Sequence, residues 1–323
     1  MKGIFALAAV LLSAAGVGIA STPQVTSKNI RVVTSGPVFT DRAFSCSGLP
    51  PKGTRRGEIV QLEAHLGPYK AVLSGTVQTI ALPYQISLSR PTVKITYDGF
   101  TSTYGLLGPE PSTFFGLGFA DKAWSSPGSS YPQSALCLGW LGSKFEPTVV
   151  VPVFTGGAHC CTLLNFFGGS AGIVLGAVNL GNPAATIAGV GNKAVLITGD
   201  NAFAYAFTDY AGSGMPIRVM QASPNTESIV TVTRSWPSLV ALDAKFWFSE
   251  YEQSVKQPPP HDLRGVLAAW AADECELGKC ASAFAFLNHV KPTYLAFSDT
   301  RIPPSAYIRQ LHHFLASHGY IRA

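Results

Sequence analysis

The cysteines of this chain, with a histidine beside one of them, carry its clearest potential for chemistry. Cys160 and Cys161 are adjacent and follow His159 in the segment TGGAHCC, and the other cysteines are Cys46, Cys137, Cys275 and Cys280. An even set of cysteines favours complete disulfide bonding in an oxidising compartment. Cysteine thiolates beside an imidazole are also ligands for zinc or copper.

The pairing of these cysteines depends on the element that holds them. Neighbouring residues of a strand point to opposite faces, so Cys160 and Cys161 would reach different partners. We therefore predict that Cys46 and Cys137 pair with Cys160 and Cys161, in an order that the sequence leaves open. A Cys160–Cys161 disulfide, which closes an eight-membered ring, is one alternative, and a metal site that uses His159 is another.

The last two cysteines bracket the segment ELGK. If two helices meet there, a Cys275–Cys280 bond would lock them as a hairpin, and we predict this pairing. The same C-x₄-C spacing could form half of a zinc site, but such a site needs two further ligands, and none stands close in the sequence. Asn192 and Asp200 offer oxygen atoms but lack the tight D-x-D-G loop that binds calcium. We therefore expect no metal and no cofactor.

A serine nucleophile is the alternative chemistry. The segment GGSAG places Ser170 in the G-x-S-x-G pattern of α/β hydrolases. Asp209 or Asp200, followed by His289, would complete a triad in the usual order. That mechanism needs a parallel sheet with crossover helices, whereas short β-type runs surround Ser170. We therefore interpret GGSAG as a hairpin turn and expect no catalytic residue.

Short β-type runs separated by turn residues fill residues 57–234. Runs such as PTVVVPVFTG and KAVLITGD recur with Gly and Pro punctuation, which is typical of antiparallel meanders. Phe203, Tyr205 and Phe207 alternate with alanines, which predicts a further strand. The pattern predicts a β-rich domain and leaves a sandwich, a barrel or a propeller-like arrangement open. Residues 21–56 are expected to form an N-terminal extended or loop segment.

Residues 235–323 have a helical pattern. Pro237 indicates the first turn of a helix, Gly278 a break between two Ala-rich helices, and Gly319 the end of the last one. This region is short for an independent core, so we expect it to pack on the β domain. The whole chain is therefore predicted to be α+β, mainly antiparallel β meanders followed by a C-terminal helical segment.

The N-terminus predicts the compartment. Residues 1–20 combine one lysine, an apolar run and small residues before Ser21, the pattern of a cleaved signal peptide. No later run is long and apolar enough to cross a membrane, so we expect no transmembrane segment after cleavage. The net charge of +5 is mild, and a loop holds its densest basic cluster. We expect no nucleic-acid partner and a periplasmic or secreted protein.

The segments FTGGAHCCTLL, ITGDNAFAYAFTDYAGSGMP and RGVLAAWAADECELGKC resemble a group of uncharacterised exported bacterial proteins with a GGAHCC motif. That group is loosely associated with FG-GAP or VCBS-type β-repeat proteins. The resemblance implies an exported β-rich protein and no particular activity. Our leading hypothesis is a non-catalytic, disulfide-stabilised protein that binds an envelope or extracellular partner. A serine hydrolase and a periplasmic metal binder are the alternatives, and any ligand pocket is expected near residues 104–119.

Overall fold

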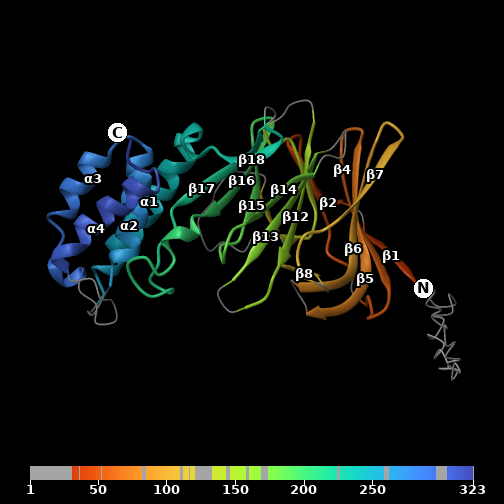
Figure 1. Cartoon of the computed structure of the whole chain (residues 1–323), viewed down its shortest axis with the longest axis horizontal. Helices are drawn as coiled ribbons and strands as arrows, with labels where there is room; N and C mark the ends of the chain where they lie inside the picture. The colour runs from red at the N-terminus through yellow and green to blue at the C-terminus, as the bar shows by residue number, and fades with distance from the viewer. Residues whose placement is uncertain are drawn as a thin grey trace, which may run out of the picture. The chain divides into compact units, whose positions relative to one another are not determined.

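The computed structural model describes residues 31–35, 37–51, 53–81, 85–109, 112–115, 117–120, 133–142, 146–157, 160–168, 174–223, 226–257, 262–295 and 304–322. In these residues a large, mostly antiparallel sheet is followed by a smaller sheet and then by helices (Figure 1). The predicted α+β class, with β structure first, is confirmed. The predicted signal peptide, residues 1–20, lies outside the described residues.

Twelve described strands form the large sheet. Their bounds are β1 Val32–Ser35, β2 Pro37–Thr40, β3 Phe44–Ser47, β4 Ile59–Leu66, β5 Tyr69–Ala81, β6 Gln85–Tyr97, β7 Phe100–Gly105, β8 Ser112–Phe115, β11 Cys137–Gly139, β12 Thr148–Phe154, β13 Thr162–Gly168 and β14 Val174–Asn179. The order is β1-β4-β5-β6-β8-β12-β11-β3-β2, with β7 on β6, β13 on β12 and β14 on β13. Only the β1–β4 pair among these described strands is parallel.

The large sheet curls around a core of its own. Residues of β4 alternate between partly exposed and buried, so that Val60, Leu62 and Ala64 point inward, as the period of a strand requires. Strands near the two ends of the sheet meet, because β3 lies against β4. The amide of His65 on β4 donates to Ser45 Oγ on β3 at 3.3 Å. The enclosed side chains form one apolar cluster.

The apolar run of β12 is explained by burial on both faces. Val149, Val151 and Val153 join the core inside the curled sheet. Val150 points the other way, into a second core that also contains Leu196 of the smaller sheet. A strand that is covered on both sides needs no polar face, so its sequence, TVVVPVF, shows no alternation of apolar and polar residues.

The smaller sheet lies between the large sheet and the helices. Its described strands are β9 Leu117–Ala120, β10 Gln133–Ser134, β15 Thr186–Val190, β16 Lys193–Gly199, β17 Ile217–Ser223 and β18 Ser228–Thr231, in the order β10-β9-β15-β16-β17-β18. Its neighbours are antiparallel except β9 and β15. On β16, Leu196 faces the large sheet, while Val195 and Ile197 face helix α1 (Pro237–Ser254).

The helical region follows. Besides α1, it contains α2 Arg264–Glu276, α3 Cys280–Leu287 and α4 Pro304–Ser317, with short 3-10 helices η2 Asn201–Phe203, η3 Thr233–Ser235 and η4 Pro292–Tyr294. Pro237 stands in the first turn of α1, and Gly278 and Gly319 adopt positive φ angles after α2 and α4, as predicted. None of the helices in the described ranges is long and apolar enough to cross a membrane.

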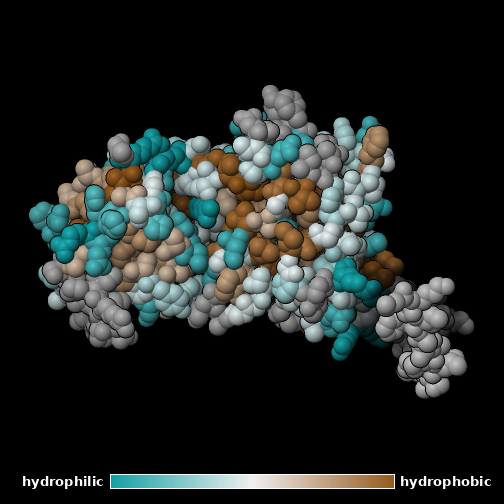
Figure 2. All heavy atoms as spheres, viewed as in Figure 1, coloured by the Kyte–Doolittle hydropathy of each residue, from teal (hydrophilic) through white to brown (hydrophobic). Residues whose placement is uncertain are grey.

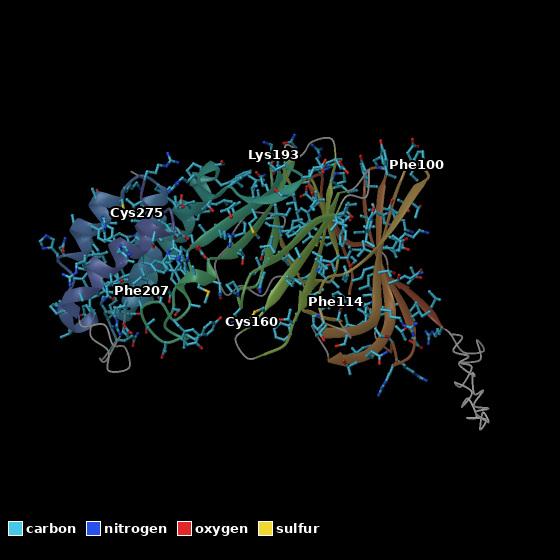
Figure 3. All side chains as sticks on the ribbon, viewed as in Figure 1. Phe100, Phe114, Cys160, Lys193, Phe207 and Cys275 are labelled. Carbon is cyan, nitrogen blue, oxygen red and sulfur yellow. A yellow bond between two sulfur atoms is a disulfide. The ribbon has the colours of Figure 1, made fainter. Side chains whose placement is uncertain are left out.

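Apolar side chains also reach the surface of the β region. On the face shown in Figure 2, hydrophobic residues gather over the middle strands, and Val174 of β14 is 53% exposed. Phe100, at the tip of the β6–β7 hairpin, is 76% exposed (Figure 3). A ligand pocket was expected near residues 104–119. In this interval Phe114 is fully buried, and the ring of Tyr104 packs against that of Phe167, so both side chains contribute to packing.

Candidate functional site

All cysteines of the chain are disulfide-bonded, as expected. The bonds are Cys46–Cys137, Cys160–Cys161 and Cys275–Cys280. The last of these confirms the predicted link between α2 and α3. Three disulfide bonds are consistent with an oxidising compartment outside the cytoplasm.

The prediction that Cys46 and Cys137 pair with Cys160 and Cys161 is wrong. Antiparallel pairing of β3 with β11 places Cys46 directly opposite Cys137, with Cα atoms 4.2 Å apart. This spacing is close to the range that a disulfide spans. Both sulfur atoms are therefore used within one pair of neighbouring strands, and Cys160 and Cys161 bond to each other.

The Cys160–Cys161 pair lies in the turn before β13 rather than in a strand, so the argument from opposite strand faces does not apply to it. Cys160 is exposed and Cys161 is buried. The amide and the hydroxyl of Thr155 both donate to the Cys161 carbonyl, at 2.9 and 3.3 Å, which closes the β12–β13 hairpin. His159 lies outside the described residues, so the alternative of a metal site that uses His159 is not tested.

The hydrolase alternative cannot be assembled from the described residues alone. Ser170 lies outside them. Asp209 is exposed and accepts the amide of Gly212 at 2.7 Å, which is a turn-forming role, and His289 is exposed just after α3. No hydrogen bond joins Asp209 to His289 in the described part of the chain. Nor do these residues contain three or more His, Cys, Asp or Glu side chains arranged to hold a metal ion.

The loop of residues 200–215 differs from its prediction. We predicted a strand from the alternation of Phe203, Tyr205 and Phe207, but the segment forms η2 followed by turns. Phe203 and Phe207, the latter labelled in Figure 3, are buried in the helical core, and both rings contact Phe314 of α4. The two phenylalanines anchor the loop, because both rings are buried against the same residue of α4.

Tyr205 is the exception between these anchors. It is 58% exposed and has a φ of +60°, a left-handed backbone conformation that bulky residues rarely adopt. Its amide donates to Ser213 Oγ at 3.0 Å, and the Ser213 hydroxyl donates in turn to the carbonyl of Asp209 at 2.7 Å. Hydrogen bonds within the loop therefore hold the backbone of Tyr205 in the conformation that leaves its ring exposed.

Tyr205 contacts Tyr210, and further contacts link Tyr210 to Asn182 and Asn182 to Asn201. We call the set of Asn182, Asn201, Tyr205 and Tyr210 the tyrosine surface. The rings of Tyr205 and Tyr210 lie 5.4 Å apart at an angle of 48°. The side-chain amide of Asn182 donates to the hydroxyl of Tyr210. Asn201 Oδ1 accepts the backbone amide of Asn182 at 3.3 Å. Two amide groups and two phenol rings are thereby combined on one surface.

Hydrogen bonds connect the tyrosine surface to the cysteine turn. The amide of Thr162, next to Cys161, donates to the carbonyl of Gly181 at 2.7 Å. Gly181 has a φ of +70°, and a Cβ at this position would overlap the side chain of Asn201. The loop before β15 therefore contacts both the segment that holds the cysteine pair and the tyrosine surface. The Cys160–Cys161 disulfide belongs to the same hydrogen-bonded group of loops.

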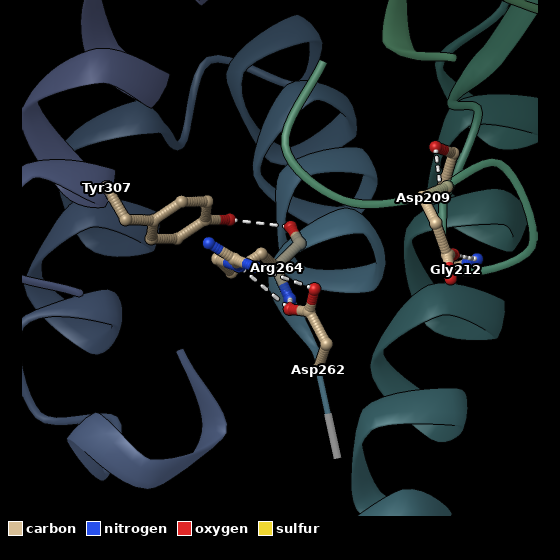
Figure 4. Close-up of polar contacts among 6 residues, drawn as sticks. Asp209, Gly212, Asp262, Arg264 and Tyr307 are labelled. Carbon is tan, nitrogen blue, oxygen red and sulfur yellow. Dashed lines mark hydrogen bonds and ion pairs between the residues drawn. The ribbon is translucent and has the colours of Figure 1, made fainter. Parts of the chain in front are cut away.

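The loop of residues 200–215 packs closely against α2. A Cβ on Gly265 would overlap the carbonyl oxygen of Gly212, and a Cβ on Gly214 would lie 2.6 Å from the carbonyl oxygen of Gly265. Next to this contact, fully buried Arg264 forms a bidentate ion pair with Asp262, at 2.8 and 2.9 Å (Figure 4). Such a pair is rigid, so it fixes the start of α2 against which the loop rests.

Figure 4 also shows how α4 is tied to this point. The hydroxyl of Tyr307, which is fully buried, donates to the carbonyl of Arg264 at 2.7 Å. Burial raises the pKa of Tyr307 well above its ordinary value, so the hydroxyl keeps the proton that it donates. The loop of residues 200–215 therefore packs against two helices, α2 and α4, that are linked to each other by this hydrogen bond.

No protein-family model, no curated protein and no solved structure matches the chain. The resemblance to exported GGAHCC proteins therefore stays a prediction.

Sequence reasoning missed Tyr205 because it interpreted the alternation of aromatic residues as a strand. The segment TDYAGSG that follows is rich in turn residues, and it lies between Phe207 and the next strand-like run. Together these signals point to a compact loop with one aromatic residue on its outer side. Exposure of that residue, however, depends on how the loop packs on the helices.

Proposed function

We propose that this chain is an exported, disulfide-stabilised and non-catalytic protein that binds a neutral glycan of the cell envelope or the extracellular medium. The observation that carries the proposal is Tyr205, an exposed ring held in a strained conformation by an anchored loop. Strain of this kind persists only where the surrounding structure enforces it, and it is concentrated at functional sites. The likeness of the chain to exported GGAHCC proteins is part of the same proposal.

The chemistry of the tyrosine surface suits a sugar. A phenol ring offers a flat apolar face to the C–H groups of a pyranose and keeps a hydroxyl for hydrogen bonding. The amides of Asn182 and Asn201 can both donate to and accept from sugar hydroxyls. The Tyr205 ring changes little on binding, because the loop already holds it, so little conformational entropy is lost.

The charge around this surface favours a neutral ligand. Residues 155–162, 179–183 and 200–215 contain no Lys or Arg, and two carboxylates, Asp200 and Asp209, lie in the last of these segments. Like charges repel an anionic polymer that approaches such a surface. Neutral polysaccharides avoid this repulsion, so nucleic acids and acidic glycans are poorer candidates.

The test is binding of the purified, oxidised protein to an array of neutral glycans, followed by titration of whichever binds. Replacing Tyr205 by Ala should weaken binding by about tenfold or more, since truncating a central aromatic contact costs roughly 1–2 kcal/mol or more. Phe100→Ala is the matched control, because Phe100 is still more exposed and lies on the β6–β7 hairpin. This control should bind as the wild type does.

Two results would overturn the proposal. One is a folded wild-type protein that binds no neutral glycan on the array. The other is a bound glycan whose affinity is the same for Tyr205→Ala and the wild type. Binding confined to acidic polysaccharides would contradict the argument from charge.

A further inference from the structure

Two carboxyl groups are buried together where the helices meet the smaller sheet. Asp243 of α1 is 1% exposed and Asp273 of α2 is 0% exposed. Their side chains lie within hydrogen-bonding reach of each other. A carboxylate can only accept hydrogen bonds, so a bond between two carboxyl groups requires a proton on one of them.

The neighbours of the pair give it few other partners. Asp243 Oδ2 accepts the amide of Ile217, the first residue of β17, at 2.8 Å and the indole N–H of Trp247 at 3.0 Å. The same Ile217 amide also lies close to Asp273 and acts to lower its pKa, but this amide donates to Asp243, and neither oxygen of Asp273 has a well-formed hydrogen bond from an N–H or hydroxyl group among the described residues. A buried carboxylate without donors is strongly disfavoured, which leaves the shared proton as the stabilising contact of Asp273.

No cation neutralises the pair. Within the described residues, neither Asp243 nor Asp273 forms an ion pair with Lys, Arg or His. Arg234, which pairs with Glu276 at 2.6 Å, also donates to the backbone carbonyls of Gly319 and Tyr320. Of the other titratable groups, Glu276 of α2 and Tyr320, after α4, lie near Asp273. Tyr320 donates in turn to Asp200, the residue before η2, and Arg322 lies near Glu276.

We propose that the Asp243–Asp273 pair is a proton-dependent latch. When a proton is shared between the two carboxyl groups, α1, α2 and the start of β17 are held together. When both groups are ionised, their repulsion loosens the helices from the smaller sheet. The latch acts at the joint that connects the helical region with the rest of the described chain.

The direction of the pH effect follows from the buried groups. Burial raises the pKa of Asp243 to about 6. Burial, together with the nearby charges of Asp243 and Glu276, raises the pKa of Asp273 well above its ordinary value. Groups whose pKa is raised in the folded state stabilise it fully below their ordinary pKa, near pH 4, and this stability is lost as the pH rises through the folded-state values.

Hydrogen exchange of the full, oxidised chain tests the latch. The measurement is the protection of the β17 peptide, Ile217–Ser223, from about pH 4 to about pH 8, corrected for the intrinsic pH dependence of exchange. Protection should fall as the pH rises, by up to tenfold per pH unit for each proton that the latched state retains. A pH-independent protection in the wild type would overturn the proposal.

Variants separate the pair from other titrating groups. Asp273→Asn should remove most of the pH dependence, because the amide cannot ionise and can donate to an ionised Asp243. Asp209→Asn, which changes an exposed carboxyl, is the control and should keep the wild-type profile. An unchanged slope in Asp273→Asn would contradict the latch.

A second variant covers the case in which Asp273→Asn does not fold. Trp247→Phe removes one of the donors that stabilise ionised Asp243, so the loss of protection should extend to higher pH than in the wild type. A profile identical to that of the wild type would overturn the proposal. None of these measurements needs a ligand, so the latch is tested independently of glycan binding.

Discussion

At the scale of single residues, Tyr205 and Asp273 are costly to fold and contribute little to the core. A bulky residue at positive φ costs about 1–3 kcal/mol, and a mostly exposed ring recovers little of this through burial. Asp273 is fully buried without a hydrogen-bond donor of its own. Residues that lower stability in this way are the ones for which a functional explanation is needed.

Substitution of Tyr205 can measure the strain directly. Tyr205→Gly should be more stable than Tyr205→Ala by about 1 kcal/mol, because glycine adopts a φ of +60° freely and alanine does not. The measurement is the free energy of unfolding from denaturant titration. Ala202→Gly, an exposed position in η2 without a positive φ, should show the opposite sign, with a loss of about 0.5–1 kcal/mol. Equal stability of the two Tyr205 variants would contradict the assignment of strain.

At the scale of elements, the loop of residues 200–215 can pack against α2 only because the helix has a glycine, and so no side chain, at the point of contact. Gly212 and Gly214 approach Gly265 so closely that no Cβ fits between them. Phe203 and Phe207 then hold the same loop in the helical core. The position of Tyr205 is therefore a property of the packing of this loop on α2 and α4.

Gly265→Ala is expected to disturb this contact. The added methyl group would overlap the carbonyl of Gly212, so we expect a loss of about 1–3 kcal/mol of stability. Thermal unfolding checks this value, and glycan binding should weaken as well, because the loop must shift. Gly105→Ala is the control, since a Cβ there meets no atom within 4 Å, and it should change stability by less than about 0.5 kcal/mol. Equal effects of the two substitutions would contradict a close fit.

At the scale of the whole molecule, successive layers are the curled large sheet, the smaller sheet and the helices. Separate apolar cores lie inside the large sheet, between the two sheets, between the smaller sheet and α1, and among the helices. The Cys46–Cys137 bond links strands that are 91 residues apart in the chain, whereas Cys275–Cys280 links residues 5 apart. The first bond therefore restricts the unfolded chain far more than the second.

Removal of each bond should show this difference. In the chain-entropy model, a loop of about 90 residues contributes roughly 4–5 kcal/mol and one of about 5 residues roughly 2 kcal/mol. We therefore expect the double variant Cys46→Ala/Cys137→Ala to lose about twice as much stability as Cys275→Ala/Cys280→Ala, in denaturant unfolding under oxidising conditions. A larger loss for the second variant would show that local packing, rather than loop length, determines the contribution.

The sequence by itself determined the properties that depend on local chemistry. Strand alternation and turn residues predicted a β region followed by helices, and the proline and glycine signals located the ends of helices at Pro237, Gly278 and Gly319. The Cys275–Cys280 bond was predictable because its partners are separated by one turn. Each of these features is decided within a few residues along the chain.

Only the tertiary structure decided the features that depend on register and packing. Cys46 lies opposite Cys137 because β3 pairs with β11, and no local pattern specifies that register. Tyr205 is exposed because the phenylalanines on either side of it turn inward to the helical core. Asp243 and Asp273 lie thirty residues apart on two helices, and the crossing of α1 and α2 brings them together. Long-range contacts of this kind are set by how the layers pack, which is why they escape prediction from sequence patterns.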